Sequence, residues 1–144
     1  MLGTVHEREG LRLPPGGVDD PVVLRIVREM TKRLNAAGCS GSWMMVRDGE
    51  VVGLCSYKRP PAEGHVEIGY STAPQRRGAG VATAAVAAVA QIANADPAIQ
   101  ALIAQTAIDN LASQRVLEKN GFVRIGQRID EAHGEAITWI KTLY

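Results

Sequence analysis

With 144 residues and a hydrophobic content of 46%, the chain is long enough to bury a core and too apolar to stay disordered. Its formal net charge of +1 gives no overall attraction to nucleic acid or acidic membranes, and aromatic side chains for stacking on bases are few. We therefore expect one domain, residues 1–144, that binds neither nucleic acid nor a membrane.

The first 41 residues predict a short strand near 11–13 and one helix. Asp19 or Asp20 is a typical N-cap with Pro21 in the first turn, and Gly38 is a typical stop. Apolar residues recur at helical spacing between these ends: Val23, Ile26, Val27, Met30 and Leu34.

The middle of the chain predicts three strands and a second helix. Strands at 42–47 and 51–57 are joined by Asp48-Gly49, which is a strong hairpin turn, and a third strand follows at 65–72. An alanine-rich helix then begins after two glycines and ends before Asp96-Pro97. Its predicted apolar stripe is Val81, Ala85, Val89 and Ile92.

The last third predicts a strand at 99–108, a helix capped by Asn110 and closed by Asn120-Gly121, and two strands at 122–129 and 135–143. This order is typical of an α/β mixture with a single strand–helix–strand crossover at its centre.

Residues 73–83 carry the most chemical information. Gly78 and Gly80 let the backbone approach a ligand closely, and the helix that follows presents N–H groups at the positive end of its dipole. Arg76 and Arg77 add two cations, so this corner predicts a site for a phosphate or pyrophosphate. The alternative is that the glycines serve only the turn.

The familiar nucleotide-binding loops fit this corner poorly. A Gly-x-Gly-x-x-Gly loop would need a glycine where Thr83 stands, and the polar run 74–77 separates the strand from the glycines. A P-loop would need a lysine that is absent between Lys58 and Lys119. Asp109 is placed roughly where a nicotinamide-dependent domain has an acidic residue, so that class stays an alternative.

Three segments, in this order, resemble the GCN5-related N-acetyltransferase (GNAT) superfamily, and within it the Rim-like N-terminal acetyltransferases of ribosomal proteins. They are 67–70 (Glu-Ile-Gly-Tyr), 77–82 (Arg-Gly-Ala-Gly-Val-Ala) and 110–122, which begins Asn-Leu-Ala-Ser and ends Asn-Gly-Phe. The second segment fits the pattern Arg/Gln-x-x-Gly-x-Gly/Ala in two registers, from Arg77 or from Gln75. The resemblance covers roughly residues 42–143.

This resemblance implies an α/β (α+β) fold with a mixed, mostly antiparallel central sheet, flanked by helices. A V-shaped splay would separate two central parallel strands, 65–72 and 99–108. The implied activity is transfer of an acetyl group from acetyl-CoA to a primary amine by direct attack in a ternary complex. Because no covalent intermediate is needed, Cys55 is not expected to act as a nucleophile.

The resemblance also implies where acetyl-CoA binds. Pantetheine would lie in the splay, the pyrophosphate on backbone amides of the glycine corner, and Arg76 or Arg77 would meet the 3′-phosphate. The implied cofactor-binding residues are Tyr70, Ser71, Thr72, Arg76, Arg77, Gly78, Ala79, Gly80, Val81, Ala82, Thr83, Asn110 and Ser113. Asn110 could instead serve only as an N-cap.

Two catalytic residues are predicted. Glu67 is the candidate base, with His65 as a possible assistant; the alternative is an ordinary sheet-face glutamate paired with a cation. Ser113, or a water, would protonate the departing thiolate. Many relatives have a tyrosine where Leu117 stands, but the Rim-like branch lacks it, and some have a glutamate where Gln105 stands.

The acceptor implied by the resemblance is a protein N-terminus or a small-molecule amine, which would approach across residues 18–41 and the turn at 127–136. Asp130, Glu131 and Glu135 make that turn acidic, which suits a cation but is also typical of a solvated turn. A homodimer is common among relatives, and the oligomeric state stays open. The alternative function is a non-catalytic acyl-CoA-binding or regulatory domain.

The remaining signals are exclusions. Cys39 and Cys55 show neither a metal-binding spacing nor a disulfide framework, and no metal site is expected. Residues 1–13 lack the pattern of a secretory signal, and the run 79–95 is shorter than the roughly 20 residues of a membrane span. We therefore expect a cytoplasmic protein.

Overall fold

The computed structural model describes residues 17, 21–36, 38–39, 41–130 and 134–143. Its elements are α2 (Pro21–Ala36), β1 (Ser42–Arg47), β2 (Glu50–Tyr57), β3 (His65–Thr72), the short 3₁₀ helix η1 (Pro74–Arg76), α3 (Val81–Asn94), β4 (Ala101–Ala107), α4 (Leu111–Lys119), β5 (Val123–Asp130) and β6 (Gly134–Thr142). Each strand and α-helix agrees with a predicted element to within two residues at either end, whereas η1 was not predicted. The predicted strand near 11–13 and the cap at Asp19 or Asp20 lie outside the described residues.

The strands form one mixed sheet in the order β1-β2-β3-β4-β6-β5. Within the described residues, β3 and β4 are the single parallel pair and every other neighbouring pair is antiparallel. The chain passes from β3 to β4 through α3, as a parallel pair requires. The sheet predicted from the sequence is therefore confirmed, and it is not the parallel sheet of a nicotinamide-binding domain.

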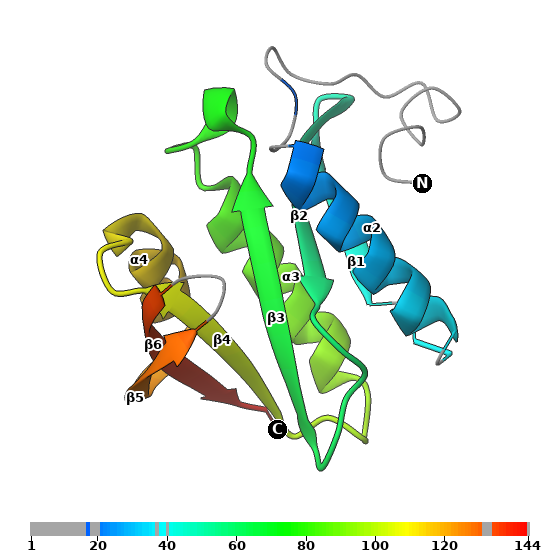
Figure 1. Ribbon diagram of the computed structural model, residues 1–144, viewed down its shortest axis with the longest axis vertical. Helices are drawn as coiled ribbons and strands as arrows, with labels where there is room; N and C mark the ends of the chain where they lie inside the picture. Colours follow the sequence, from blue (N-terminus) through cyan, green and yellow to red (C-terminus); the bar gives the residue numbers. More distant parts are fainter. Residues whose placement is uncertain (1–16, 18–20, 37, 40, 131–133, 144) are drawn as a thin grey trace.

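The two central strands separate along their length. β3 pairs with β4 from His65 opposite Ala101 to Ile68 opposite Ala104, and the pairing stops there. Beyond this point β3 pairs only with β2, as far as Thr72 opposite Gly53, while β4 continues along β6. Figure 1 shows β3 and β4 diverging toward the end that carries η1, which is the predicted V-shaped splay.

Helices cover both faces of the sheet. In Figure 1, α2 lies in front of the strands and α3 behind them. A hydrogen bond of 2.8 Å between Thr31 Oγ1 and Ser42 Oγ links α2 to β1. The Asn120 side chain, at the C-terminal end of α4, donates to Thr83 O in the first turn of α3 at 3.2 Å. Because α3 follows β3 and α4 follows β4, both helices begin near the end at which the two strands diverge.

The buried face of α3 is rotated slightly from the predicted stripe. Val81 and Val89 are buried as expected, but Ile92 is 48% exposed. The other buried residues of this helix are Val86, Ala90 and Ala93. The spacing from Val86 to Ala93 is one helical face, and Ile92 lies at its margin, where it lines a groove beside β1.

Candidate functional site

The glycine corner is built so that backbone, and not side chains, faces outward. Gly78 and Gly80 have φ of +80° and +76°, a region that residues with a Cβ rarely adopt. A Cβ added at either position would meet no heavy atom within 4 Å, so both backbones border open space. Gly80 is also the N-cap of α3 and contributes no side-chain cap.

The first turn of α3 supplies the donors of this corner. The amides of Val81, Ala82 and Thr83 precede the first intrahelical bond, which runs from Ala84 N to Gly80 O at 3.1 Å. They lie at the positive end of the helix dipole, where an anion is stabilised. The corner therefore presents amide donors without an intrahelical partner, which are the groups that the predicted phosphate site requires.

The two predicted arginines have different surroundings. Arg76 forms a two-point ion pair with Glu50: Nε donates to Oε1 at 2.6 Å and Nη2 donates to Oε2 at 3.1 Å. These hydrogen bonds raise the pKa of Arg76 above its usual value, so the guanidinium stays charged. Arg77 is exposed and forms no hydrogen bond or ion pair with any described residue. Arg77 is thus the better placed of the two to meet a phosphate.

One contact at the corner has no counterpart in the sequence prediction. Arg47, the last residue of β1, donates from Nη1 to the backbone oxygen of Ala79 at 3.1 Å. The two residues are 32 positions apart, and no periodicity or motif relates them.

The splayed half of β3 leaves backbone groups available beside the corner. Tyr70, Ser71 and Thr72 pair with β2 on one side and have no partner on β4. Their free edge can hydrogen-bond an extended ligand in the manner of an added strand. These are the three residues predicted to contact pantetheine.

Tyr70 connects this half of β3 to the start of α4. Its hydroxyl lies 2.8 Å from Ser113 Oγ and donates to Ser113 O at 3.1 Å. Burial raises the pKa of Tyr70 to about 12, so the phenol stays protonated at neutral pH. Asn110 Oδ1 accepts from Ser113 N at 3.1 Å, which confirms the predicted N-cap. Ser113 is therefore held from both sides.

Glu67 lies on the paired half of β3 and contacts a cation. Lys58 Nζ is 3.2 Å from Glu67 Oε2, and both side chains are mostly covered. This is the sheet-face pairing given above as the alternative to a base. His65 is exposed at the start of β3.

On the neighbouring strand, Gln105 is also hydrogen-bonded. Thr138 Oγ1 donates to Gln105 Oε1 at 2.8 Å, across the β4–β6 pair. Leu117, the position at which the resemblance implies a tyrosine in many relatives, is fully buried in the core. Of the predicted acidic turn, Glu135 is exposed, and Glu131 and the side chain of Asp130 lie outside the described residues.

Three further properties of the described residues bear on the site. Burial raises the pKa of Cys55 to about 12, which keeps this residue an unreactive thiol. In the described part of the chain, no group of three or more His, Cys, Asp or Glu could hold a metal ion. None of the described helices has both the length and the apolar character needed to cross a bilayer.

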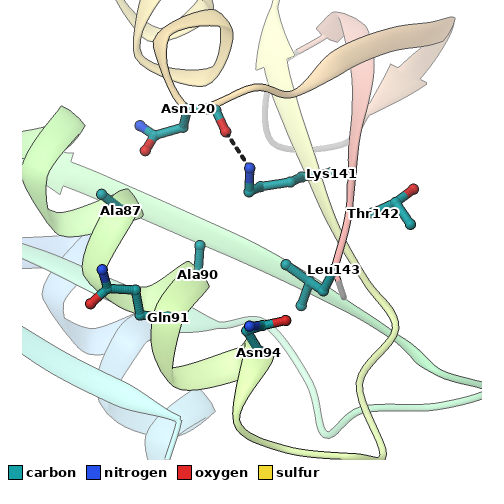
Figure 2. A pocket seen from close by; sticks show the side chains of 8 residues that line it. All are labelled: Ala87, Ala90, Gln91, Asn94, Asn120, Lys141, Thr142 and Leu143. Carbon is teal, nitrogen blue, oxygen red and sulfur yellow. Dashed lines mark hydrogen bonds between the residues drawn. The ribbon is translucent and has the colours of Figure 1, made fainter.

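Two cavities lie away from the splay. One, of about 290 Å³, lies between the second half of α3 and the end of β6, and Figure 2 shows the hydrogen bond of 2.7 Å from Lys141 Nζ to Asn120 O at its side. None of the predicted site residues lines it. The other, of about 310 Å³, is an apolar groove between β1 and α3 that reaches the corner at Arg47 and Val81.

A parallel strand pair that opens beside a glycine corner and the starts of two helices defines the GNAT class of acetyltransferase fold. The chain belongs to this family, because the family model described as "Acetyltransferase (GNAT) domain" matches residues 15–123. No curated protein matches the sequence at a significant level.

Solved structures support the same fold. The ribosomal L7/L12 alpha-N-protein acetyltransferase RimL in complex with coenzyme A has a TM-score of 0.70 and 17% identity, over 81% of this chain and 70% of that chain. The microcin C7 self-immunity acetyltransferase MccE, with acetyl-CoA and AMP, has a TM-score of 0.70 and 16% identity, over 83% and 69%.

An aminoglycoside acetyltransferase, AAC(6')-Ib with coenzyme A, has a TM-score of 0.61 and 23% identity over 70% of this chain. The present chain spans about 65% of the length of that enzyme. Identities this low show a common fold and do not extend the substrates of these three proteins to the present chain.

Proposed function

We propose that the protein is an N-acetyltransferase that moves an acetyl group from acetyl-CoA to a primary amine by direct attack in a ternary complex. The observation that carries the proposal is the free edge of β3 from Tyr70 to Thr72, which leads directly into the glycine corner. One extended donor with an amide-containing arm and a pyrophosphate matches both features.

The corner would hold the phosphates of the donor. Backbone amides from Gly78 to Thr83 surround open space at the two glycines, so a pyrophosphate can approach without meeting a Cβ. Arg77 is free to meet a phosphate by a charge-assisted hydrogen bond. The pantetheine arm would pair with β3 and pass the start of α4 at Asn110 and Ser113.

Acetyl transfer needs a neutral amine, an oriented thioester and donors for the oxyanion. In the proposed mechanism, Glu67 removes the amine proton directly or through a water. Lys58 contacts Oε2 of this carboxylate, and carboxylate oxygens accept several hydrogen bonds, so the ion pair leaves capacity for a substrate proton. The backbone amide of Tyr70 would stabilise the oxyanion, because the register directs the amide of Gly69 to β2 and that of Tyr70 to the free edge.

The departing thiolate would take its proton from Ser113. A phenol has one proton, so the Ser113 proton is available to a ligand when Tyr70 donates to Ser113 Oγ instead of Ser113 O. We assign the acid to Ser113, with a water as the alternative.

The second candidate function is a non-catalytic acyl-CoA-binding domain. The Lys58–Glu67 ion pair favours it, because a carboxylate already engaged by a cation resembles a structural sheet contact. The buried Leu117, in place of a tyrosine acid, is compatible with both functions.

Thiol release from acetyl-CoA with a panel of amines separates the two. The panel should hold peptide N-termini, aminoglycosides, polyamines and amino acids, because the structurally similar enzymes act on chemically different acceptors. We expect at least one class to stimulate release. If CoA binds at micromolar concentration while no amine stimulates release, the binding-domain function is correct.

A further inference from the structure

The β1–β2 hairpin contacts the glycine corner at two points. Arg47, at the end of β1, donates to Ala79 O at 3.1 Å. Glu50, at the start of β2, accepts both hydrogen bonds of Arg76 in η1, at 2.6 and 3.1 Å. The tight turn Asp48-Gly49 separates the two hairpin residues, so they lie at one end of the hairpin.

The Arg47 contact determines which way the amide of Gly80 points. The carbonyl of Ala79 and the N–H of Gly80 belong to one planar trans peptide, in which they point in opposite directions. Because Arg47 draws the carbonyl toward the hairpin, the N–H of Gly80 points away from it. The positive φ of Gly80 then leads directly into α3.

The Glu50 contact fixes the other side of the loop. A carboxylate that accepts two parallel hydrogen bonds from a guanidinium sets the orientation of both groups, and not only their distance. The Glu50 side chain is only 13% exposed, so this pair is partly shielded from water. Between the two contact points lie Arg77 and Gly78, which border open space.

We propose that Arg47 and Glu50 are positioning residues for donor binding: they hold the loop from Arg76 to Gly80 in the conformation that receives the pyrophosphate of acetyl-CoA. This inference rests on the proposed function. It assigns Arg76 to the hairpin and leaves Arg77 as the arginine that contacts a phosphate. It also predicts that the two hairpin residues affect donors with a pyrophosphate and no others.

The experiment compares two donors, acetyl-CoA and S-acetylpantetheine, which lacks the pyrophosphate and the nucleotide. Arg47→Met and Glu50→Gln should each raise the KM for acetyl-CoA and the Kd for CoA by about threefold to tenfold, the scale of one or two hydrogen bonds. At saturating acetyl-CoA, kcat should be retained. The kcat/KM for S-acetylpantetheine should stay at the wild-type value.

Two controls separate positioning from general damage. Arg59→Met removes an exposed arginine from the β2–β3 loop and should leave kcat/KM unchanged for both donors. Exchanging the charges, Glu50→Arg together with Arg76→Glu, should recover part of the affinity for CoA that each single change loses.

Each outcome decides the inference. Equal losses with both donors, or a double exchange no better than the single changes, would overturn it. So would wild-type CoA affinity in Arg47→Met and Glu50→Gln. If the wild-type protein itself does not bind CoA, the proposed function fails, and that failure is visible before any variant is made.

Discussion

The two halves of β3 have the same backbone conformation and different surroundings. From His65 to Ile68 the strand pairs with β4, and within this half only Ile68 also has a register partner on β2, Tyr57. From Gly69 to Thr72 it is paired only with β2 and has a free edge. The first half contributes buried side chains to the core, Val66 and Ile68, and the free edge of the second half is the proposed donor-binding edge.

The difference shows how one strand can serve both stability and binding. The proposed donor site consists largely of backbone, from the free edge of β3 through the corner to the first turn of α3. The proposed proton transfer from the acceptor depends instead on a side chain, that of Glu67, which already has Lys58 as a partner. Changes in the backbone-built part should therefore affect the donor, and changes in Glu67 should affect turnover.

The largest effect is expected at the corner. Gly80→Glu places bulk and negative charge where the pyrophosphate would lie, and should abolish CoA binding, by at least about 100-fold in Kd. Calorimetry with CoA measures it. Gly38→Glu is the matched control, because Gly38 also has a positive φ of +76° and open space around a Cβ. Affinity retained in Gly80→Glu would contradict the loop assignment.

A smaller loss, confined to turnover, is expected at the paired half of β3. Glu67→Gln should lower kcat at neutral pH by about 100-fold, the lower end of general-base effects, with CoA affinity unchanged. Initial rates with saturating acetyl-CoA and the best amine measure it.

The partner of Glu67 provides the matched test. Lys58→Met removes the cation and keeps most of the side-chain stem. If the ion pair is only structural, Lys58→Met and Glu67→Gln should lower stability equally and leave the turnover rate unchanged. If Glu67→Gln turns over at the wild-type rate, Glu67 is a structural residue and the binding-domain function gains support.

Tyr70 should give a still smaller effect. Tyr70→Phe keeps the ring and removes the hydroxyl that holds Ser113, and should lower kcat by about threefold to tenfold. Tyr57→Phe, which removes a phenol from the adjacent strand, is the control. Equal kcat in the two variants would show that the Tyr70–Ser113 contact has no part in turnover.

The smallest effect is on stability at high pH. The pKa of Tyr70 is raised to about 12 in the folded protein, above its value of about 10 in an unfolded chain. The stability from keeping this phenol neutral is fully present below pH 10 and is lost as the pH rises toward 12. Melting temperatures from pH 9 to 12 should therefore fall more steeply for the wild-type protein than for Tyr70→Phe. Parallel curves would contradict the burial of this hydroxyl.

The features that could be predicted from the sequence are local ones. Asp48-Gly49 forms the hairpin turn, with both residues at positive φ; Gly80 begins α3; and Asn110 caps α4. Each acts within three or four residues of itself, so neighbouring sequence is sufficient to read it.

The features that could not be predicted join distant residues. Glu50 and Arg76 are 26 positions apart, and Tyr70 and Ser113 are 43 apart. No sequence period or motif spacing marks either contact, because each depends on how the fold places two distant elements side by side. The partner of Arg76 therefore could not be predicted from the sequence, although the motif identified the corner itself.

The side chain of Asn120 affects the distance between the glycine corner and Ser113. Its amide donates to Val116 O in its own helix at 2.9 Å and to Thr83 O at 3.2 Å, so the end of α4 is fastened to the beginning of α3. Because this contact joins the two helices, it restricts the distance between the glycine corner and Ser113. In the proposed complex the arm of the donor spans that distance, so we expect binding to depend on the length of the arm.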